Sequence, residues 1–240
     1  MKEYADKQVL FPFENLLKAE FLVWENRFRA EVLLKGEKVK VHVPNTGRMR
    51  ELLYPGAEVW VKPADNPERK TAYTLFLVKN EDTYICLYAS LANNLIGFWM
   101  ERGLLAGFRN AEEIQREKTY GKSRFDFKLK REERTCYAEV KSVNLVVDST
   151  ARFPDAPTER GSKHLKELIR VKEDGMDAAV LFLVMGNHAL DFEANADTDP
   201  AFAKNLKEAT RHGVEIYIHT CEVTLEGVYY HGMIPMRGEN

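Results

Sequence analysis

An almost uninterrupted apolar run at residues 177–185, DAAVLFLVM, constrains the fold of this chain more than any other feature. A strand with one face in water alternates apolar and polar side chains, but this run has apolar side chains on both faces. Such a run is typical of a strand inside a parallel sheet. It therefore predicts a central sheet covered by helices on both sides.

The segments around this run predict the helices and strands of that α/β domain. Thr158 can cap a helix that continues to about Gly175, and Asp199 with Pro200 opens another helix that Gly213 closes. The segment VEIYIHTCEV at residues 214–223 then predicts the next strand. At residues 89–105 the helical spacing of four apolar residues predicts a helix that bridges into this domain. The four residues are Leu91, Leu95, Phe98 and Trp99. We place the whole domain at residues 89–240.

Residues 1–88 are rich in strands. Turn residues separate five short runs of β-branched and aromatic residues, at 21–34, 37–44, 57–63, 72–80 and 83–90. Five such strands favour a small OB-like barrel, a fold that often binds oligonucleotides. The predicted fold class is therefore mixed α/β, with an OB-like β-barrel followed by an α/β domain.

Composition and cysteine usage exclude several classes of protein. The chain has 240 residues, 45% of them hydrophobic, which is enough to bury a substantial core. Cys86, Cys136 and Cys221 are widely spaced and odd in number, so they predict neither a disulfide framework nor a CxxC metal site. The first residues lack a long apolar segment, and no stretch of 18 apolar residues occurs. We expect a cytoplasmic protein without a membrane span, and the sequence leaves a homo-oligomer open.

Charge is unevenly distributed although the net charge is only −2. Residues 109–172 contain 16 Lys and Arg against 11 Asp and Glu, whereas residues 173–240 contain 4 against 12. A basic middle segment can focus an anionic ligand onto one region. Two ordinary solvated faces are the alternative interpretation.

Two carboxylates are predicted to meet on a β-hairpin. The segments SRFDFKLK and TCYAEVKS predict its strands, and a turn centred on Glu132 and Glu133 places Asp126 opposite Glu139. Alternation predicts three side chains directed to the core, Phe125, Phe127 and Leu129, and directs Asp126 to the other face. Lys141 follows Glu139 on that same face.

Opposed carboxylates repel one another by a few tenths to about 1 kcal/mol unless another group compensates. A divalent cation, Mg²⁺ or Mn²⁺, is a suitable compensator because its ligands are oxygen atoms. Lys141 could orient an attacking water and stabilise charge on a phosphoryl group. The alternative is an exposed sheet face, on which Asp126 and Glu139 pair with Lys128, Lys141 or water.

The chain also resembles the sugar fermentation stimulation protein (SfsA) family, from about Phe11 to Pro235. The resemblance rests on six segments: PNTGRM (44–49), DNPERKTAYT (65–74), YGKSRFDF (120–127), AEVKSV (138–143), FPDAPTERGSKHLKEL (153–168) and GVEI (213–216). Two segments depart from the family pattern. YASLANN (88–94) stands where the family reads something like NTxLAN, and Pro157 replaces a small or β-branched residue.

The resemblance implies an OB-like domain at residues 1–88 and a PD-(D/E)XK restriction-endonuclease-like domain at residues 89–240. It also implies a protein that binds DNA with little sequence preference and is linked to the regulation of sugar (maltose) metabolism. In that pattern Asp126 is the acidic residue, and Glu139 with Lys141 forms the E-x-K. Glu117, ahead of the Tyr120–Gly121 step, is implied as a third metal ligand.

Further residues are candidates for contacts with nucleic acid, because they are basic and lie near turns or at the start of a helix. They are Arg48, Arg69, Lys70, Arg124, Arg160, Lys163 and His164. Ordinary surface turns, and an interface histidine at position 164, are the alternatives. We expect Trp24, Trp60 and Trp99 in the core, and the other five histidines lack metal-ligand spacing.

Three functional hypotheses remain. The first is a DNA-binding protein with metal-dependent phosphodiesterase chemistry at Asp126, Glu139 and Lys141. The second is a non-catalytic DNA-binding regulator in which the same residues are structural or vestigial. The third, a carbohydrate-processing enzyme that uses the carboxylates as acid and base, ranks last because no sugar-stacking aromatic pattern lies beside them.

Overall fold

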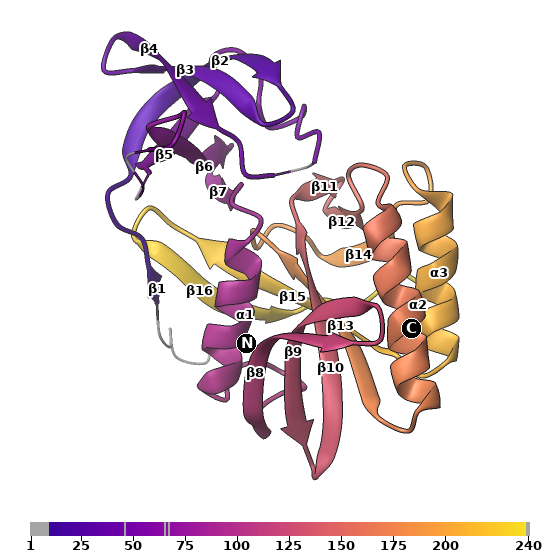
Figure 1. Cartoon of the computed structure of the whole chain (residues 1–240). Coiled ribbons are helices and arrows are strands. Elements are labelled where there is room, and N and C mark those ends of the chain that lie inside the picture. The colour runs from indigo at the N-terminus through magenta and orange to yellow at the C-terminus, as the bar shows by residue number, and fades with distance from the viewer. Residues whose placement is uncertain (1–9, 46, 65, 67, 239–240) are drawn as a thin grey trace, which may run out of the picture.

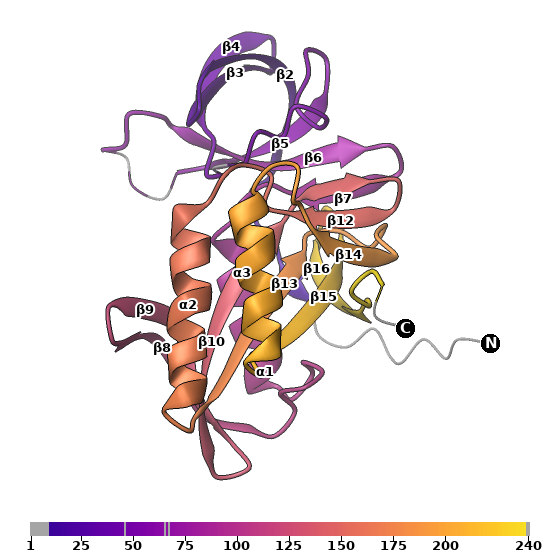
Figure 2. The same ribbon diagram turned by 90° about the vertical axis from the view of Figure 1, so that its right-hand side faces the viewer.

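The computed structural model describes residues 10–45, 47–64, 66 and 68–238 (Figure 1). A β-barrel lies above a larger α/β domain, and the predicted fold class is confirmed. Five strands close the barrel because β4 pairs with β6 as well as with β3, and they form a ring in Figure 2. The barrel strands are β2 (Leu17–Asn26), β3 (Arg29–Leu34), β4 (Glu37–His42), β5 (Glu58–Pro63) and β6 (Tyr73–Asn80).

The predicted number of barrel strands is right, but two of the assignments are wrong. The run at residues 21–34 is a hairpin of two strands, β2 and β3, which reverses direction at residues 27–28. The run at residues 83–90 contributes β7 (Thr83–Cys86), which pairs only with β6 and stays outside the closed ring. Periodicity missed the reversal because Arg27 and Phe28 are not turn-forming residues.

A seven-stranded sheet forms the second domain, in the order β1-β16-β15-β13-β10-β9-β8. At its centre β13 (Asp177–Val184) pairs parallel to both β10 and β15 and is buried throughout, as its apolar run predicts. Its neighbours are β8 (Ala111–Tyr120), β9 (Ser123–Arg131), β10 (Arg134–Val143), β15 (Glu215–Val223), β16 (Gly227–Met233) and β1 (Phe11–Pro12). Because β1 belongs to this sheet, residues 11–12 lie outside the barrel to which the predicted domain boundary assigns them.

Helices cover both faces of this sheet. One face packs on α1 (Leu91–Glu101), which begins two residues inside the predicted bridging segment, and the other on α2 (Glu159–Glu173) and α3 (Pro200–Arg211) (Figures 1 and 2). The predicted caps are present: Thr158 accepts from the Gly161 N–H, and Asp199 accepts from the Phe202 N–H. In the described part of the chain, no helix has the length and hydropathy to span a membrane.

Burial on two faces changes the predicted alternation in β9. Phe127 and Leu129 join the core beneath α1, but Phe125 packs against Tyr137 and His164 on the α2 side. The prediction of one common face for the three side chains is therefore wrong. The β9–β10 ladder ends at the pair Phe127–Ala138, and Asp126 lies just beyond it, where the strand changes face.

Three strands with little sequence signal form a small separate sheet in the order β11-β12-β14. They are β11 (Leu145–Val147), β12 (Thr150–Phe153) and β14 (Asp191–Ala194). Each has only three or four residues, which is too short for periodicity to separate from a loop. This sheet carries the segment between β12 and α2 that forms one wall of the functional cleft.

The barrel and the second domain share a core. Trp60, Phe76 and Cys86 from the barrel side belong to the same buried cluster as Leu95 and Trp99 of α1. Polar contacts reinforce the junction, because the Asn45 amide donates to Asn144 Oδ1 at 3.0 Å and the Asn144 amide donates to the Cys86 carbonyl oxygen at 2.6 Å. A cleft between the two parts therefore has rigid walls.

The β9–β10 hairpin turn predicts a stability effect. Glu132 and Glu133 have φ values of 49° and 64°, and Asn-Gly fits a two-residue turn of this kind best. We expect the double substitution Glu132→Asn/Glu133→Gly to raise the free energy of unfolding by about 1 kcal/mol in urea denaturation. Glu31→Gly, in regular strand β3, should lower it, and equal effects from the two changes would contradict this account.

Candidate metal and nucleic-acid site

The hairpin register brings the two predicted carboxylates together. Strands β9 and β10 pair Arg131 with Arg134 and Phe127 with Ala138, the register that the turn predicts, and Asp126 and Glu139 are the next residues of the two strands. One Asp126 oxygen accepts from the Val140 N–H at 2.6 Å, and the other accepts from the Asn93 amide at 2.7 Å. Asp126 is therefore held by its partner strand and by α1.

Glu139 is held from one side only. Glu139 is 3% exposed. Its Oε1 atom accepts a hydrogen bond from Lys141 Nζ at 2.5 Å and contacts Nδ1 of His164. The Oε2 atom is buried and has no hydrogen-bond partner among the described residues. An unsatisfied carboxylate oxygen in the interior is costly, so this atom is poised to take a ligand.

The two carboxylates have opposite pKa shifts. Burial raises the pKa of Asp126 to about 6 and the charge on Glu139 adds to the rise, while the Val140 N–H, Lys141 and Asn93 oppose it. Burial also raises the pKa of Glu139, but the hydrogen bond from His164 and the charge on Lys141 outweigh it and lower that pKa overall. Two nearby carboxylates with separated pKa values are typical of functional sites.

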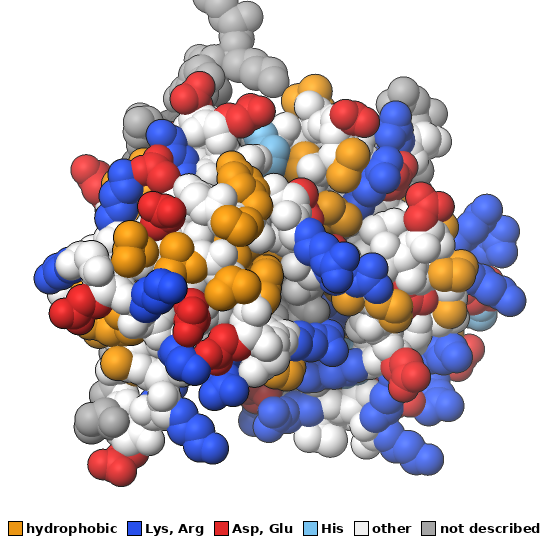
Figure 3. All heavy atoms as spheres, turned by 90° about the horizontal axis from the view of Figure 1, so that it is seen from above, with side chains coloured by type: hydrophobic (Ala, Val, Ile, Leu, Met, Phe, Trp, Pro, Cys, Tyr) orange, Lys and Arg blue, Asp and Glu red, His pale blue; other side chains and the backbone are white. Residues whose placement is uncertain are grey.

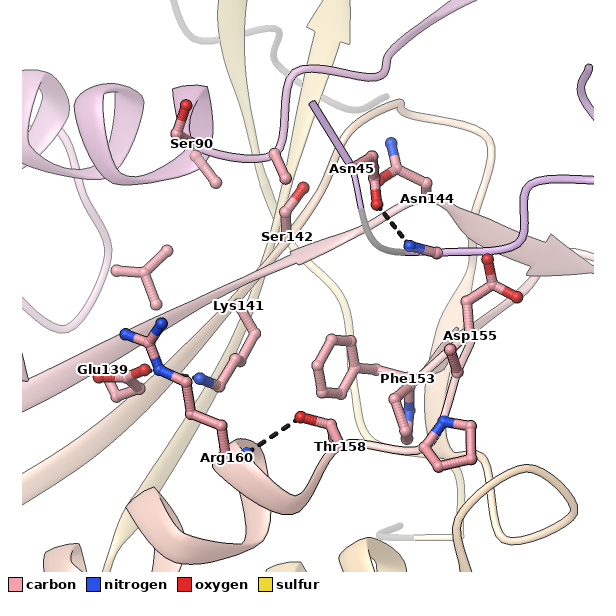
Figure 4. Close-up of a pocket in the computed structure, with 18 of the residues that line it drawn as sticks. Asn45, Ser90, Glu139, Lys141, Ser142, Asn144, Phe153, Asp155, Thr158 and Arg160 are labelled. Carbon is pink, nitrogen blue, oxygen red and sulfur yellow. Dashed lines mark hydrogen bonds and ion pairs between the residues drawn. The ribbon is translucent and has the colours of Figure 1, made fainter. Parts of the chain in front are cut away.

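Asp126, Glu139 and Lys141 line one cleft of about 520 Å³ at the junction of the barrel and the second domain. Figure 4 shows Glu139 and Lys141 at one end, with Arg160 extending over the cleft from the start of α2. The predicted convergence of the three side chains is confirmed, while their roles in metal binding and catalysis stay predictions.

The far end of the cleft depends on contacts between the two domains. Asn45, at the end of the barrel segment, donates to the Leu87 carbonyl oxygen as well as to Asn144, and accepts from the Gly47 N–H. Asp155, from the segment before α2, accepts from the Met49 N–H at 3.1 Å. Figure 4 shows Asn45, Asn144 and Asp155 grouped at this end. Asn45 and Gly47 of the PNTGRM segment therefore line the cleft.

Two predicted roles do not match the observed positions. Glu117 has a left-handed backbone with φ 54°, and its carboxylate pairs with Nε of Arg124 at 2.8 Å. No group of three or more His, Cys, Asp or Glu side chains in the described ranges is arranged to hold a metal ion, so Glu117 does not join the pair. His164 is 4% exposed and its Nδ1 atom contacts Glu139, so its side chain is buried beside that carboxylate and is not presented on the surface.

The basic residues predicted to contact nucleic acid are dispersed. Arg160 lines the cleft, and Arg48 lines a second cleft beside it. Arg69 donates to Thr74 Oγ1 at 3.2 Å, and Lys163 Nζ donates to the Lys122 carbonyl oxygen at 2.8 Å. Lys70 is exposed and lines neither cleft. Two residues of the DNPERK turn, Asp65 and Pro67, lie outside the described residues.

The second cleft, of about 530 Å³, corrects one prediction. Trp60 and Trp99 are core residues as expected, but Trp24 is only partly buried and lines this cleft with Arg48 and Arg50. The sequence pattern of β2 could not indicate that Trp24 faces a cleft, because the β2–β3 register shifts on both sides of Trp24. Such bulges redirect side chains.

Sequence reasoning also missed Asn93. It lies in the YASLANN segment, the place where the chain departs from the family pattern, and its amide holds Asp126. A helical wheel would have indicated it, because Asn93 lies on the polar side of a helix whose other side is buried.

The barrel, the buried parallel strands and the carboxylate pair define a class of protein: an OB domain joined to a restriction-endonuclease-like domain. Family models agree, since the one described as the SfsA N-terminal OB domain matches residues 24–87. The one described as the sugar fermentation stimulation protein RE domain matches residues 90–227. The chain belongs to the sugar fermentation stimulation protein family.

Individual relatives resemble the chain over most of its length. The sugar fermentation stimulation protein homolog of Methanobrevibacter smithii is 46% identical over 213 residues, covering 85% of this chain and 89% of the relative. That of Caldanaerobacter subterraneus subsp. tengcongensis is 44% identical, covering 87% and 91%. The structure of Pyrococcus furiosus SfsA in complex with Ca²⁺ has a TM-score of 0.88 and 29% identity, covering 95% of this chain and 98% of that one.

Proposed function

We propose that this protein binds DNA with little sequence preference and hydrolyses phosphodiester bonds with a divalent cation, Mg²⁺ or Mn²⁺, held by Asp126 and Glu139. One observation carries the proposal: Asp126, Glu139 and Lys141 line the same cleft, and Glu139 Oε2 is buried there with no hydrogen-bond partner in the described ranges. The absence of a disulfide among three buried cysteines supports action in the cytoplasm.

The residues at this position fit a divalent cation. Within the part of the chain that the structure describes, each Asp126 oxygen accepts one hydrogen bond and keeps a lone pair, and Glu139 Oε2 has no partner. Carboxylate oxygens are the ligands that Mg²⁺ and Ca²⁺ prefer, and a cation would offset the repulsion between the two carboxylates. The solved structure of the Pyrococcus relative is a complex with Ca²⁺, which supports a divalent-cation site in this chain.

The surrounding side chains have distinct tasks in this proposal. A divalent cation supplies Lewis acidity toward a phosphoryl oxygen. The Lys141 ammonium stabilises negative charge that develops on that phosphoryl group. Arg160 and the N-terminus of α2 attract the phosphate into the cleft. Asn93 and His164 position Asp126 and Glu139 through hydrogen bonds.

DNA binding is proposed to depend on phosphate contacts from basic residues: Arg48, Arg69, Lys70, Arg124, Arg160 and Lys163. To contact a phosphate, Arg124 must break its ion pair with Glu117, and Lys163 must break its hydrogen bond to the Lys122 carbonyl oxygen. Because phosphate contacts release counterions, the affinity should fall steeply between low and physiological salt and change little with sequence. An affinity that is insensitive to salt in a fluorescence anisotropy titration would contradict this prediction.

The deciding experiment scores binding and cleavage separately. Purified protein is incubated with labelled single-stranded and double-stranded DNA in Mn²⁺, Mg²⁺ or EDTA. Cleavage that needs the cation supports the proposal. Binding with no cleavage under any of these conditions would overturn the hydrolytic part of it.

A second candidate function is a non-catalytic DNA-binding regulator of sugar metabolism. The observation that favours it is the charge compensation of Glu139 by the protein itself, since Lys141 and His164 both engage its Oε1 atom. In that protein the carboxylates are structural, so Asp126→Asn and Glu139→Gln would bind DNA as the wild type does in both EDTA and Mn²⁺.

Metal affinity is expected to depend on pH. Asp126 has a pKa raised to about 6, and a cation must displace its proton below that pH. Affinity should therefore be constant at neutral and alkaline pH and about tenfold lower near pH 5. Isothermal titration calorimetry with Mn²⁺ measures this, and unchanged affinity down to about pH 5 would contradict it.

A further inference from the structure

We propose that Trp24, Arg48 and Arg50 form a subsite that holds one unpaired nucleotide next to the carboxylate cleft, so that the preferred DNA is single-stranded. This inference rests on the proposed DNA-binding function and names its substrate class. It depends on the second cleft, which neither the carboxylates nor Lys141 line.

The two clefts adjoin. Arg27, Gly47, Ala156 and Pro157 line both of them, so the cleft of Trp24 borders the cleft of Glu139 and Lys141. A DNA strand that places a phosphate beside the carboxylates would extend from the first cleft into the second. In the view from above, Lys and Arg side chains gather near the centre of the face, beside a hollow (Figure 3).

Trp24 has the position of a stacking platform. It packs on Phe21 with ring centroids 5.7 Å apart and an interplanar angle of 62°, an edge contact that leaves part of the indole accessible. Bulges in the β2–β3 ladder on both sides of Trp24 direct it to the cleft. Aromatic side chains on OB-like barrels bind bases by stacking, independent of sequence.

Arg48 and Arg50 supply the charge for the backbone of that nucleotide. Both side chains are exposed, and neither makes an ion pair with any of the described residues. The nearby Asp155 carboxylate is engaged by the Met49 N–H, which fixes the segment that carries both arginines. The guanidinium groups are therefore available to phosphate.

The dimensions favour one strand over two. A cleft of about 530 Å³ is in the range of small-ligand pockets and accommodates a nucleotide, whereas a duplex is too wide to enter and keeps its bases stacked inside. Stacking on Trp24 requires an exposed base face. A paired base would first have to leave the helix, at a cost of a few kcal/mol.

Tryptophan fluorescence tests the subsite without catalysis. Trp60 and Trp99 are 7% and 0% exposed, so quenching by oligothymidylate would report mainly on Trp24. With the full chain in EDTA, we expect oligothymidylate to quench the emission and a blunt duplex to leave it nearly unchanged. In Trp24→Phe the quenching should disappear.

Affinity measurements with matched variants complete the test. Trp24→Ala should weaken binding of labelled oligothymidylate by about 5- to 100-fold, and Trp24→Phe, which keeps an aromatic face, by much less. Arg48→Ala/Arg50→Ala should weaken it and reduce the salt dependence by about two counterions. The control variant Lys38→Ala changes an exposed cation of the same barrel outside the cleft, and should bind as the wild type does.

The outcomes separate this inference from the proposed function. Unquenched emission in the wild-type protein, together with wild-type affinity in Trp24→Ala and in the double arginine variant, would overturn the subsite, even if metal-dependent cleavage occurs. Quenching and the predicted losses in a protein without cleavage activity would support the subsite while the hydrolytic proposal fails. Circular dichroism of each variant shows whether the barrel has folded.

Discussion

Replacing Lys141 with alanine is expected to reduce metal-dependent DNA cleavage by about 10²–10³-fold, because its ammonium group lies 2.5 Å from Glu139 Oε1 and stabilises developing charge. Metal binding should persist, since Asp126 and Glu139 remain. Single-turnover cleavage in Mn²⁺ measures the first quantity and calorimetry measures the second.

Two further variants make this result specific. Glu139→Gln keeps the shape of the side chain but removes its charge, so it should lose both metal affinity and cleavage while DNA affinity in EDTA stays near the wild-type value. Lys128→Ala is the matched control, because Lys128 lies on β9 over the Tyr137 ring and does not line the cleft. Equal losses of cleavage in Lys128→Ala and Lys141→Ala would show that the effect comes from removing any positive charge and not from the position of Lys141.

Asp126→Asn is expected to make the metal-free protein more stable while it abolishes metal binding. The pKa of Asp126 is raised from 3.8 to about 6, so the folded protein binds more protons than the unfolded chain between these values. Stability is therefore lost as pH rises through about 6. Removing the charge should raise the free energy of unfolding near pH 8 by about 2 kcal/mol, somewhat less than the full pKa shift because asparagine offers one fewer acceptor.

Urea denaturation in EDTA near pH 8 and near pH 4 checks both the sign and the pH window. Near pH 4 the wild-type carboxyl is already protonated in the folded state, and the two proteins should have similar stability. A variant that is less stable than the wild type near pH 8 would show that the hydrogen bonds from Val140 and Asn93 outweigh the burial of charge. A gain in stability with a loss of binding is typical of functional sites.

The sequence by itself determined the elements whose signal is local. The apolar run at residues 177–185 could only be an interior strand, and Thr158 and Asp199 cap their helices by bonding to the backbone three residues further on. The register of β9 and β10 also follows from a short turn, since two residues at the tip determine every pair along the ladder. The meeting of Asp126 with Glu139 was therefore predictable.

Only the tertiary structure decided how the cleft is completed. Asn93 reaches Asp126 from 33 positions away and His164 reaches Glu139 from 25, and no local pattern encodes such contacts. Glu117 pairs with Arg124 because the backbone of β8 is left-handed at that residue, which strand periodicity does not predict. Trp24 faces the second cleft because bulges in β2 change its direction. Local hydrogen bonding and side-chain alternation act over a few residues, whereas a site built from two domains depends on packing between distant segments.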